Sequence, residues 1–578
     1  MERFNRLACD VVRGIGTVFV GYLFLQGLFT ICCIRRVTEL TYYMKNDVFR
    51  QIIGIVLFGV AVYFLQRLQQ SPKLKTEKNK QFAQKYGDRL VLIVLFIVLA
   101  AFAVWILITR FWYIGDMEKI YQYAGMILEG DFSGWYPGGY PYEWTQQNAL
   151  ILFVAVLLKL FGGNGSFLVF YFVNLIFYGV ALGAIAITLR QLAESREEYV
   201  AQSLMVVLYF PFGFLVTMLY GDMIGFAWGC VSMAFLINWL NKRRLVWLIC
   251  SCISMILAVN FRQNELIFFL GILVILLMDC LNGIHVKPEK GGSGGDNRGW
   301  IRPVGSRFAL LAIYILLAVV GFSIPDRIIE GVGNVHIEGG NSRWAHVAMG
   351  MQESDKAPGW YNNYVDTVFI DSGYDTDTTT KAAKAAIGER LDTFKEQPAY
   401  AWLFFHRKLA SEWNNPTFEC FHIQNSRKTS LELSSLVKSM INDGGKLNIL
   451  LIGLLDIAQS IVLFGVLMYL ICVRTTDLKK MLFMILFIGG FIFFAFWEAK
   501  CRYVLPFYLL LIPYAYPGYA AVIRQKRVKT VAVLAAIVLL IGVSDNRWIC
   551  DAFKLNQNTN EYYEYIHQYD HNFEWFRF

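Results

Sequence analysis

Long apolar runs recur along the chain and are separated by short polar connectors. A helix rises about 1.5 Å per residue, so about 20 apolar residues are enough to cross the hydrocarbon core of a bilayer. The pattern predicts thirteen membrane-spanning helices, at residues 12–34, 50–66, 89–109, 166–189, 200–219, 223–240, 244–259, 266–283, 307–324, 447–472, 480–496, 503–521 and 528–545. We therefore predict an all-α polytopic membrane protein.

A further apolar run at 148–162 is short, and the charge pattern decides how we interpret it. Connectors on the cytoplasmic side of a membrane protein keep an excess of Lys and Arg. Four connectors are basic, at residues 67–89, 241–244, 284–307 and 523–529. If 148–162 crossed the bilayer, the second and third of these would face outward. We therefore predict that 148–162 lies in the membrane interface, with the N-terminus inside and the C-terminal tail outside.

This topology divides the chain into five parts. They are 1–88, with two extra N-terminal spans and a basic cytoplasmic loop; 89–324, a transmembrane core with an outer loop at 110–165; 325–446, a small extracytoplasmic α-rich domain; 447–545, the C-terminal spans; and 546–578, an extracytoplasmic tail. The first apolar run is too long for the apolar part of a cleavable signal peptide, so we expect it to be a retained span.

Composition agrees with a chain that is partly surrounded by lipid. Of the 578 residues, 56% are hydrophobic and only 17% are charged, and a soluble protein could not bury so much apolar surface. The formal net charge is +9. Beside membrane spans such charge sets orientation, so we predict contact with membrane lipids and none with nucleic acid. The eleven cysteines show no zinc-site or disulfide spacing.

Ionisable residues of both signs gather in the predicted outer turns. Charged groups beside the hydrocarbon are functional candidates, because exposing them there is costly. The turns contain Asp116, Glu118, Asp222, Arg262, Glu265, Glu498, Lys500, Arg502 and Tyr503. Other interpretations remain open for single residues: Asp222 as a helix cap, the arginines as interfacial anchors, and the many nearby rings as an aromatic belt. The convergence on one face of the membrane carries the functional interpretation.

These residue types suit a lipid-linked sugar substrate. A carboxylate can act as a general base toward an acceptor hydroxyl. An arginine can bind a phosphate and stabilise the charge that develops on it as it leaves. Aromatic rings such as that of Tyr140 offer flat apolar faces against which a sugar can pack. We expect a sugar donor activated by phosphate on a membrane lipid, because nucleotide sugars are cytoplasmic.

Three motifs resemble those of the GT-C glycosyltransferases, particularly the family 39-like bacterial members. The first comprises Asp116, Tyr123, Ala124, Gly130, Tyr140, Pro141, Leu160, Phe161 and Gly162; the second is Asp222; the third comprises Glu498, Arg502, Tyr503 and Pro506. Segments 341–363 and 387–418 look like the extracytoplasmic loop of Gram-positive members. Two features depart from the pattern. Met117 separates the two acidic residues that are adjacent in many relatives, and spans 12–34 and 50–66 precede the usual first helix.

The resemblance implies a hexosyltransferase of the plasma membrane with its active site on the extracytoplasmic face. It would move a sugar, with inversion, from a polyprenyl-phosphate donor to a glycan, lipid or protein acceptor of the cell envelope. Asp116 would be the general base, supported by Glu118. Asp222 would lie near the sugar, or would bind a divalent metal together with Asp116 if one is used. The donor phosphate and substrate would contact Arg502, Tyr503, Glu498, Arg262 and Tyr140.

Two other classes of function share part of this pattern. A transporter or flippase for a lipid-linked glycan would have similar spans and buried charges, but broken mid-span helices in matching halves are not evident. A polysaccharide polymerase or ligase would also use outer-face arginines. No histidine cluster settles metal use, since His336, His346 and His406 are scattered and we expect them to be structural.

Overall fold

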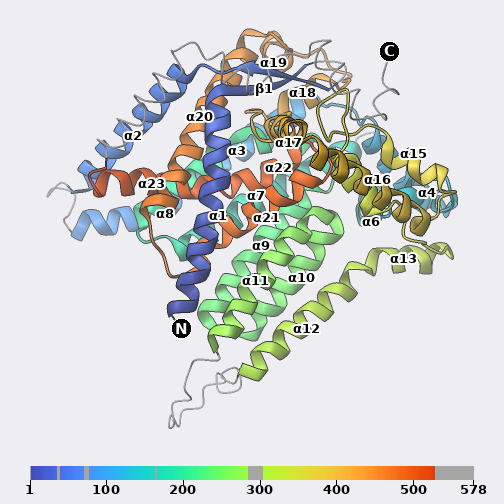
Figure 1. Cartoon of the computed structure of the whole chain (residues 1–578), viewed down its shortest axis with the longest axis horizontal. Helices are drawn as coiled ribbons and strands as arrows, with labels where there is room; N and C mark the ends of the chain where they lie inside the picture. Colours follow the sequence, from blue (N-terminus) through green and yellow to red (C-terminus); the bar gives the residue numbers. More distant parts are fainter. Residues whose placement is uncertain (1, 36–38, 71–76, 163–165, 284–303, 528–578) are drawn as a thin grey trace.

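The computed structural model describes residues 2–35, 39–70, 77–162, 166–283 and 304–527. Within them the chain is almost entirely helical, as predicted (Figure 1). In these ranges, nine helices or helix pairs are long and apolar enough to cross a membrane. They lie in α1 (Glu2–Phe29), α2 (Val48–Gln70), α3 (Glu77–Thr109), α7 (Ser166–Leu192), α9 (Asp222–Lys242), η4 with α11 (Gln263–Glu265, Leu266–Gly283), α12 with α13 (Val304–Phe322, Ile324–Gly333), α20 (Lys446–Cys472) and η6 with α21 (Leu478–Met481, Leu482–Phe496).

Three further apolar segments are bent, so the described residues contain up to twelve spans if each bent segment crosses once. The bent segments are η1, α5, η2 and α6 (Ser133–Trp135, Tyr140–Glu143, Thr145–Gln147, Asn148–Phe161), α8 with η3 (Arg196–Leu208, Phe210–Thr217), and α22 with α23 (Cys501–Leu509, Ile512–Arg524). Their bends are 95°, 43° and 51°. The predicted span 244–259 is the shorter helix α10 (Leu245–Phe261), and the predicted span 528–545 lies outside the described residues.

Prolines account for two of the breaks. Pro211 follows the end of α8, and Pro513 stands at the start of α23. Proline has no N–H group to donate and its ring displaces the preceding turn of a helix. The predicted spans 200–219 and 503–521 are therefore each two short helices that meet at an angle.

The predicted first span, 12–34, is wrong at its outer end. Helix α1 ends at Phe29, and β1 (Thr30–Arg35) pairs antiparallel with β2 (Leu40–Lys45). Thr30, Ile31 and Ile34 are β-branched and therefore suit a strand. The hairpin docks on the helical domain, because the Cys32 N–H donates to the Asn414 carbonyl at 2.9 Å. The prediction rested on apolarity alone and therefore extended the first helix beyond Phe29.

The described parts of the basic connectors meet at one end of the bundle. Asp88 pairs with Arg190 and Arg196, and Arg243 pairs with Asp279. Two neighbouring lysines of η6 join this end: Lys479 donates to Asn241, and Lys480 pairs with Glu194. The charge pattern along the sequence predicts that this end is cytoplasmic.

Segment 110–165 leaves and re-enters the bundle at the opposite end. The Tyr171 hydroxyl, near the start of α7, donates to the Phe111 carbonyl at 2.7 Å, just after the end of α3. Between these points, α6 packs beside α4 (Asp116–Glu129) and α13, away from the centre of the bundle (Figure 1). Helix α6 also contacts α7 and α10, and the interfacial position of 148–162 stays a prediction.

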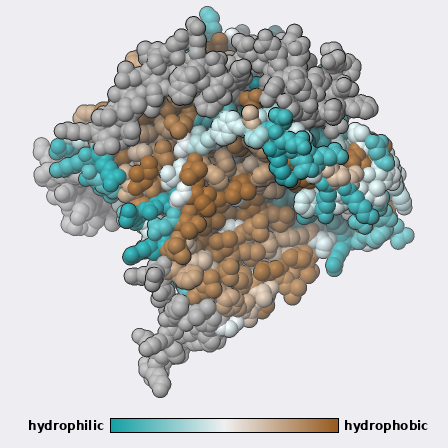
Figure 2. Space-filling view, in the orientation of Figure 1, coloured by the Kyte–Doolittle hydropathy of each residue, from teal (hydrophilic) through white to brown (hydrophobic). Residues whose placement is uncertain are grey.

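Residues 325–446 form an α-rich layer over the same end as α4 and α6 (Figure 1). It contains α14 (Arg343–Gly350), α15 (Tyr364–Asp371), α16 (Thr376–Glu396), α17 (Pro398–Trp413), α18 (Cys420–Asn425) and α19 (Ser435–Ile441). Small apolar clusters around Met349 and Phe404 hold the layer together. Apolar side chains cover the middle of the face shown in Figure 2, with polar ones on either side, as expected for a bundle surrounded by lipid.

Helix α17 joins this layer to the bundle through buried charged groups. The Lys408 ammonium donates to the carbonyls of Gly350 and Trp497, each at 2.6 Å. Glu412, one turn further on, is fully buried, and neither of its oxygens has a hydrogen-bond partner among the described residues. Burial raises the pKa of Glu412 to about 8, against the opposing effect of Lys408.

The first prediction concerns α6. In a chain freed of its native cysteines, Phe161→Cys, at the exposed end of α6, should react with a membrane-impermeant thiol reagent added from outside. Asp392→Cys on α16 is the matched outer control, and Asn241→Cys is the inner control. Reaction of Phe161→Cys from the cytoplasmic side alone would contradict the predicted topology.

The second prediction concerns Glu412. Between the ordinary carboxyl pKa and about 8, the folded chain holds a proton on Glu412 that the unfolded chain has released. The free energy of unfolding should therefore fall as pH rises from 5 to 7, by about 1 kcal/mol per pH unit relative to Glu412→Gln. Thermal unfolding of both proteins in detergent measures this difference. Parallel pH profiles would show that Glu412 does not retain the proton.

Candidate functional site

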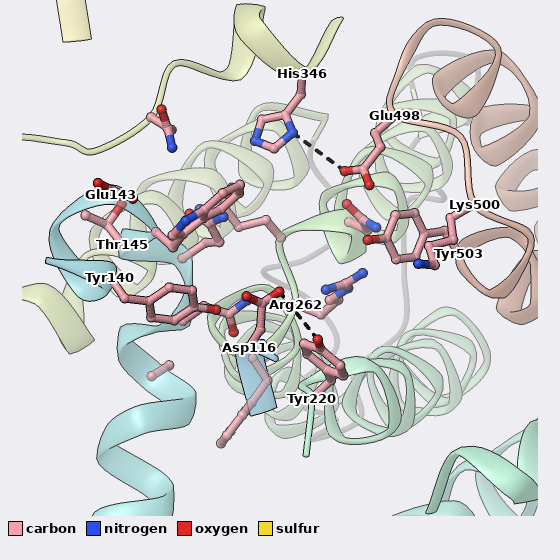
Figure 3. A pocket seen from close by; sticks show the side chains of 18 of the residues that line it. Asp116, Tyr140, Glu143, Thr145, Tyr220, Arg262, His346, Glu498, Lys500 and Tyr503 are labelled. Carbon is pink, nitrogen blue, oxygen red and sulfur yellow. Dashed lines mark hydrogen bonds and ion pairs between the residues drawn. The ribbon is translucent and has the colours of Figure 1, made fainter. Parts of the chain in front are cut away.

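A cavity of about 1010 Å³ opens between the helix ends and the α-rich layer. Its wall includes residues from the start of α4, the loop before α9, the junction of α10 and η4, the junction of α12 and α13, and the connector between α21 and α22. Figure 3 shows the side chains that face one another across it. Asp116, Arg262, Glu498 and Arg502, which the sequence places in predicted outer turns, all line this cavity.

Asp116 is the first residue of α4, and its carboxylate faces the cavity (Figure 3). Gly115 before it has φ of +57°, a conformation that side chains other than glycine's rarely adopt. The free N–H groups of the first turn of a helix favour a carboxylate at this position. The Tyr220 hydroxyl donates to Asp116 Oδ2 at 3.4 Å, and both residues line the cavity.

Arg502 packs against the ring of Tyr220, the same residue that contacts Asp116. Its guanidinium carbon is 4.7 Å from the ring centroid of Tyr220 and 5.3 Å from that of Tyr503. The residue is only 9% exposed, and its Nε has no hydrogen-bond partner in the described part of the chain. No described carboxylate lies within ion-pair distance of it. Arg502 is therefore a buried cation with donors free to bind an anion in the cavity.

Asp222 and Arg262 form a pair behind the cavity surface. Arg262 Nη2 lies 3.2 Å from Asp222 Oδ1, and the guanidinium also lies over the Tyr503 ring at 4.9 Å. Gly221 permits this contact, because a Cβ there would come within 1.8 Å of the Phe261 carbonyl oxygen. Arg262 lines the cavity whereas Asp222 does not. Asp222 thus orients Arg262 and does not itself reach the space where a substrate would lie.

Glu498 faces His346 across the upper part of the cavity (Figure 3). His346 Nδ1 lies 3.8 Å from Glu498 Oε2, and the imidazole stacks on Trp497 with ring centroids 4.8 Å apart. Burial acts to raise the pKa of Glu498, but His346, Lys500 and Arg502 outweigh it and lower that pKa below its ordinary value. Glu498 is therefore an anion at neutral pH.

Tyr140 lies on the side of the cavity opposite Glu498 and Lys500 of the α21–α22 connector (Figure 3), and Trp144, whose ring centroid is 6.4 Å from that of Tyr140, also lines the cavity. Tyr140 packs against Tyr123 with ring planes 15° apart, and the Lys119 ammonium lies 5.0 Å from its ring centroid. Side-chain amides also line the cavity. Asn341 is among them, and both polar atoms of its side chain are buried without a hydrogen-bond partner in the described residues. Such amides and rings suit a ligand with hydroxyl groups and flat apolar faces.

Glu118 does not line the cavity. It is exposed on the outer surface of α4, two residues beyond Asp116, so helix geometry points it elsewhere. As for a metal, no group of three or more His, Cys, Asp or Glu side chains among the described residues is arranged to hold one. Asp116 and Asp222 therefore lack a third described protein ligand of these types, and Asp222 is already paired with Arg262.

The cavity contains chemically important residues that sequence reasoning did not select. They are Glu39, Asn341, His346, Lys356 and Asp366. His346, expected to be structural, is part of the wall. Burial and the nearby Asp116 carboxylate raise the pKa of Asp366, while a hydrogen bond from Tyr361 opposes them. The polar and aromatic composition of the predicted outer segments was the one signal in the sequence for these cavity residues, and it does not single out their positions.

The sequence matches no protein-family model, and no curated protein is significantly similar to it.

Proposed function

We propose that this protein is a membrane glycosyltransferase that moves a sugar from a polyprenyl-phosphate donor to an extracytoplasmic acceptor. One observation carries the proposal. A carboxylate, Asp116, and a buried guanidinium, Arg502, face one cavity, and Tyr220 contacts both; no carboxylate of the described residues pairs with Arg502. Sugar transfer from a phosphate needs a base on one side of the anomeric carbon and a stabiliser of the leaving phosphate on the other.

The reaction would proceed by direct displacement. Asp116 accepts the proton of an acceptor hydroxyl while the oxygen of that hydroxyl forms a bond to the anomeric carbon. The bond from this carbon to the phosphate oxygen breaks, and its electron pair stays on the phosphate. Arg502 stabilises that charge with two parallel N–H donors. The products are the glycosylated acceptor and the polyprenyl phosphate, with inversion at the anomeric carbon.

Apolar residues give the donor's lipid chain a place beside the cavity. Val259, Leu266, Val319 and Phe322 line it from α10, α11 and α12. On α12 the apolar surface continues outward, since Leu316 and Val320 are 63% and 49% exposed. A phosphate bound at Arg502 would thus sit at the membrane surface with its polyprenyl chain in the lipid.

The position of the cavity favours transfer over transport. Its polar residues lie at the ends of α9, α10, α11 and α12, whereas a transporter binds its substrate near the middle of the bilayer. A polymerase or ligase would use the same cations, but it does not explain the carboxylate at the start of α4. The plasma membrane and the outer face remain the proposed location.

The third prediction tests the donor site. Arg502→Ala should reduce transfer by at least about 10²-fold, because removing one preorganised stabiliser of developing charge costs this much. Arg502→Lys should retain part of the activity, since it keeps a point charge but loses the planar pair of donors. Arg327→Ala on α13, an exposed arginine outside the cavity, is the matched control. Normal turnover in Arg502→Ala would move the donor phosphate elsewhere.

The fourth prediction tests the base. Asp116→Asn keeps the shape of the side chain but not its basicity, so transfer should fall by about 10²–10⁴-fold with folding intact. Glu118→Gln should do much less, because Glu118 points away from the cavity. The measurements are transfer of radiolabelled sugar from a polyprenyl-phosphate donor and thermal unfolding in detergent. Normal transfer by Asp116→Asn with an inactive Glu118→Gln would make Glu118 the base; activity in both would remove the main support for a transferase.

A further inference from the structure

The β-hairpin that follows α1 contributes a charged residue to the cavity. Glu39 stands just before β2 and has φ of +57°, the left-handed region that non-glycine residues seldom occupy. Such backbone conformations persist where surrounding contacts hold them, and they are frequent at functional sites. Glu39 lines the cavity together with Lys500, which is 461 positions away in the chain.

The Glu39 carboxylate bridges two lysines from different parts of the chain. Its Oε1 lies 3.0 Å from Lys500 Nζ, and its Oε2 lies 3.1 Å from Lys356 Nζ. Lys500 precedes α22, and Lys356 lies in the loop after α14. Both lysines line the cavity. Two ammonium groups on the two oxygens of one anion form an arrangement that would equally suit two oxygens of a phosphate.

The charges of this group are firmly set. Burial acts to raise the pKa of Glu39, but Lys500 and Lys356 outweigh it and lower that pKa well below its ordinary range. Burial likewise acts to lower the pKa of Lys500, while Glu419 and Glu39 raise it overall. Glu39 is thus an anion throughout the physiological range and is a poor general base. Its contribution to the cavity is its negative charge.

The hairpin holds Glu39 in place through several contacts. The Thr41 N–H donates to the Lys356 carbonyl at 2.9 Å, so the hairpin also fixes the backbone that carries one of the lysines. Tyr43 donates through its hydroxyl to the Arg407 carbonyl at 3.1 Å, and the Arg407 guanidinium lies 4.3 Å from the Tyr43 ring centroid. These contacts fix the position of Glu39 in the wall of the cavity.

Lys500 and Arg502 differ in how their charges are balanced. Glu39 compensates Lys500 and Lys356, whereas no described carboxylate pairs with Arg502 two residues further along. The three cations would together bind a ligand that carries two linked phosphates. With Glu39 present, the lysine pair is already occupied by an anion, and a second phosphate would meet a fixed negative charge.

We propose that Lys356 and Lys500 form a second anion-binding subsite beside Arg502, and that Glu39 occupies it and restricts the cavity to ligands with a single phosphate. This inference rests on the proposed function for the role of Arg502. It also gives the N-terminal spans a purpose, since the hairpin between α1 and α2 supplies the residue that sets which phosphate-linked donor is accepted.

The test compares the binding of inorganic phosphate and inorganic pyrophosphate to the full-length protein in detergent, by calorimetry at fixed pH and ionic strength without divalent cations. Glu39→Gln keeps the shape of the side chain and removes its charge. The ratio of pyrophosphate affinity to phosphate affinity should rise at least about tenfold in this variant. Glu396→Gln, an exposed carboxylate on α16, is the matched control and should leave the ratio unchanged.

Two further variants distinguish an effect at the lysine subsite from a general effect of removing one negative charge. Adding Lys356→Gln to Glu39→Gln should return the ratio toward that of the unaltered protein. Lys356→Gln alone removes one of the two cations of the subsite and leaves Glu39 in place, so it should lower the ratio, and it serves as the test if Glu39→Gln does not fold. An unchanged ratio in Glu39→Gln, or no detectable pyrophosphate binding by it, would overturn the inference. Sugar transfer by Arg502→Ala is a separate measurement, so failure of the proposed function would be recognised independently.

Discussion

Lipid offers no hydrogen-bond partner to an irregular backbone, and the rest of this structure depends on that constraint. Within the hydrocarbon every N–H and C=O must be satisfied inside its own helix, so turns and broken helices collect at the bundle ends or inside the protein. The cavity lies where several such breaks coincide, at the start of α4, the loop before α9 and the junction of α10 and η4. The polar side chains at these helix ends and loops therefore line the same cavity.

Ion pairing then determines which of these polar side chains are available to bind a ligand. Asp222 pairs with Arg262, and Glu39 pairs with both Lys356 and Lys500, because a buried charge without a partner is costly. Arg502 is buried among tyrosine rings and has no such carboxylate in the part of the chain that the structure describes. A site of this kind has several of its charges paired before any ligand enters, and Arg502 marks a place where an anionic ligand would bind.

The α-rich layer and the N-terminal hairpin act together as supports for this end of the bundle. Lys408 on α17 binds the Trp497 carbonyl, directly before Glu498. The hairpin contacts both α17 and the loop that carries Lys356. Groups on the α21–α22 connector are thus positioned from above by segments far away in the sequence, which explains why a cavity of this size keeps a defined wall.

The sequence by itself indicated the helical membrane class, the approximate bounds of most apolar helices, and the grouping of Asp116, Arg262, Glu498 and Arg502, which line one cavity. Apolar length and Lys/Arg asymmetry report these features directly, because they reflect the partition of each segment between lipid and water. Function and metal use stay predictions at this level.

Only the tertiary structure decided which charged side chains face the cavity and which form ion pairs with one another. Apolarity does not distinguish a helix from the strand at Thr30–Arg35, and spacing did not show that Asp222 turns to Arg262 or that Glu118 points away. The sequence placed Lys500 in the outer turn, but not its pairing with Glu39, since their contact bridges 461 positions. Long-range contacts of this kind arise from packing, and no local pattern of residues encodes them.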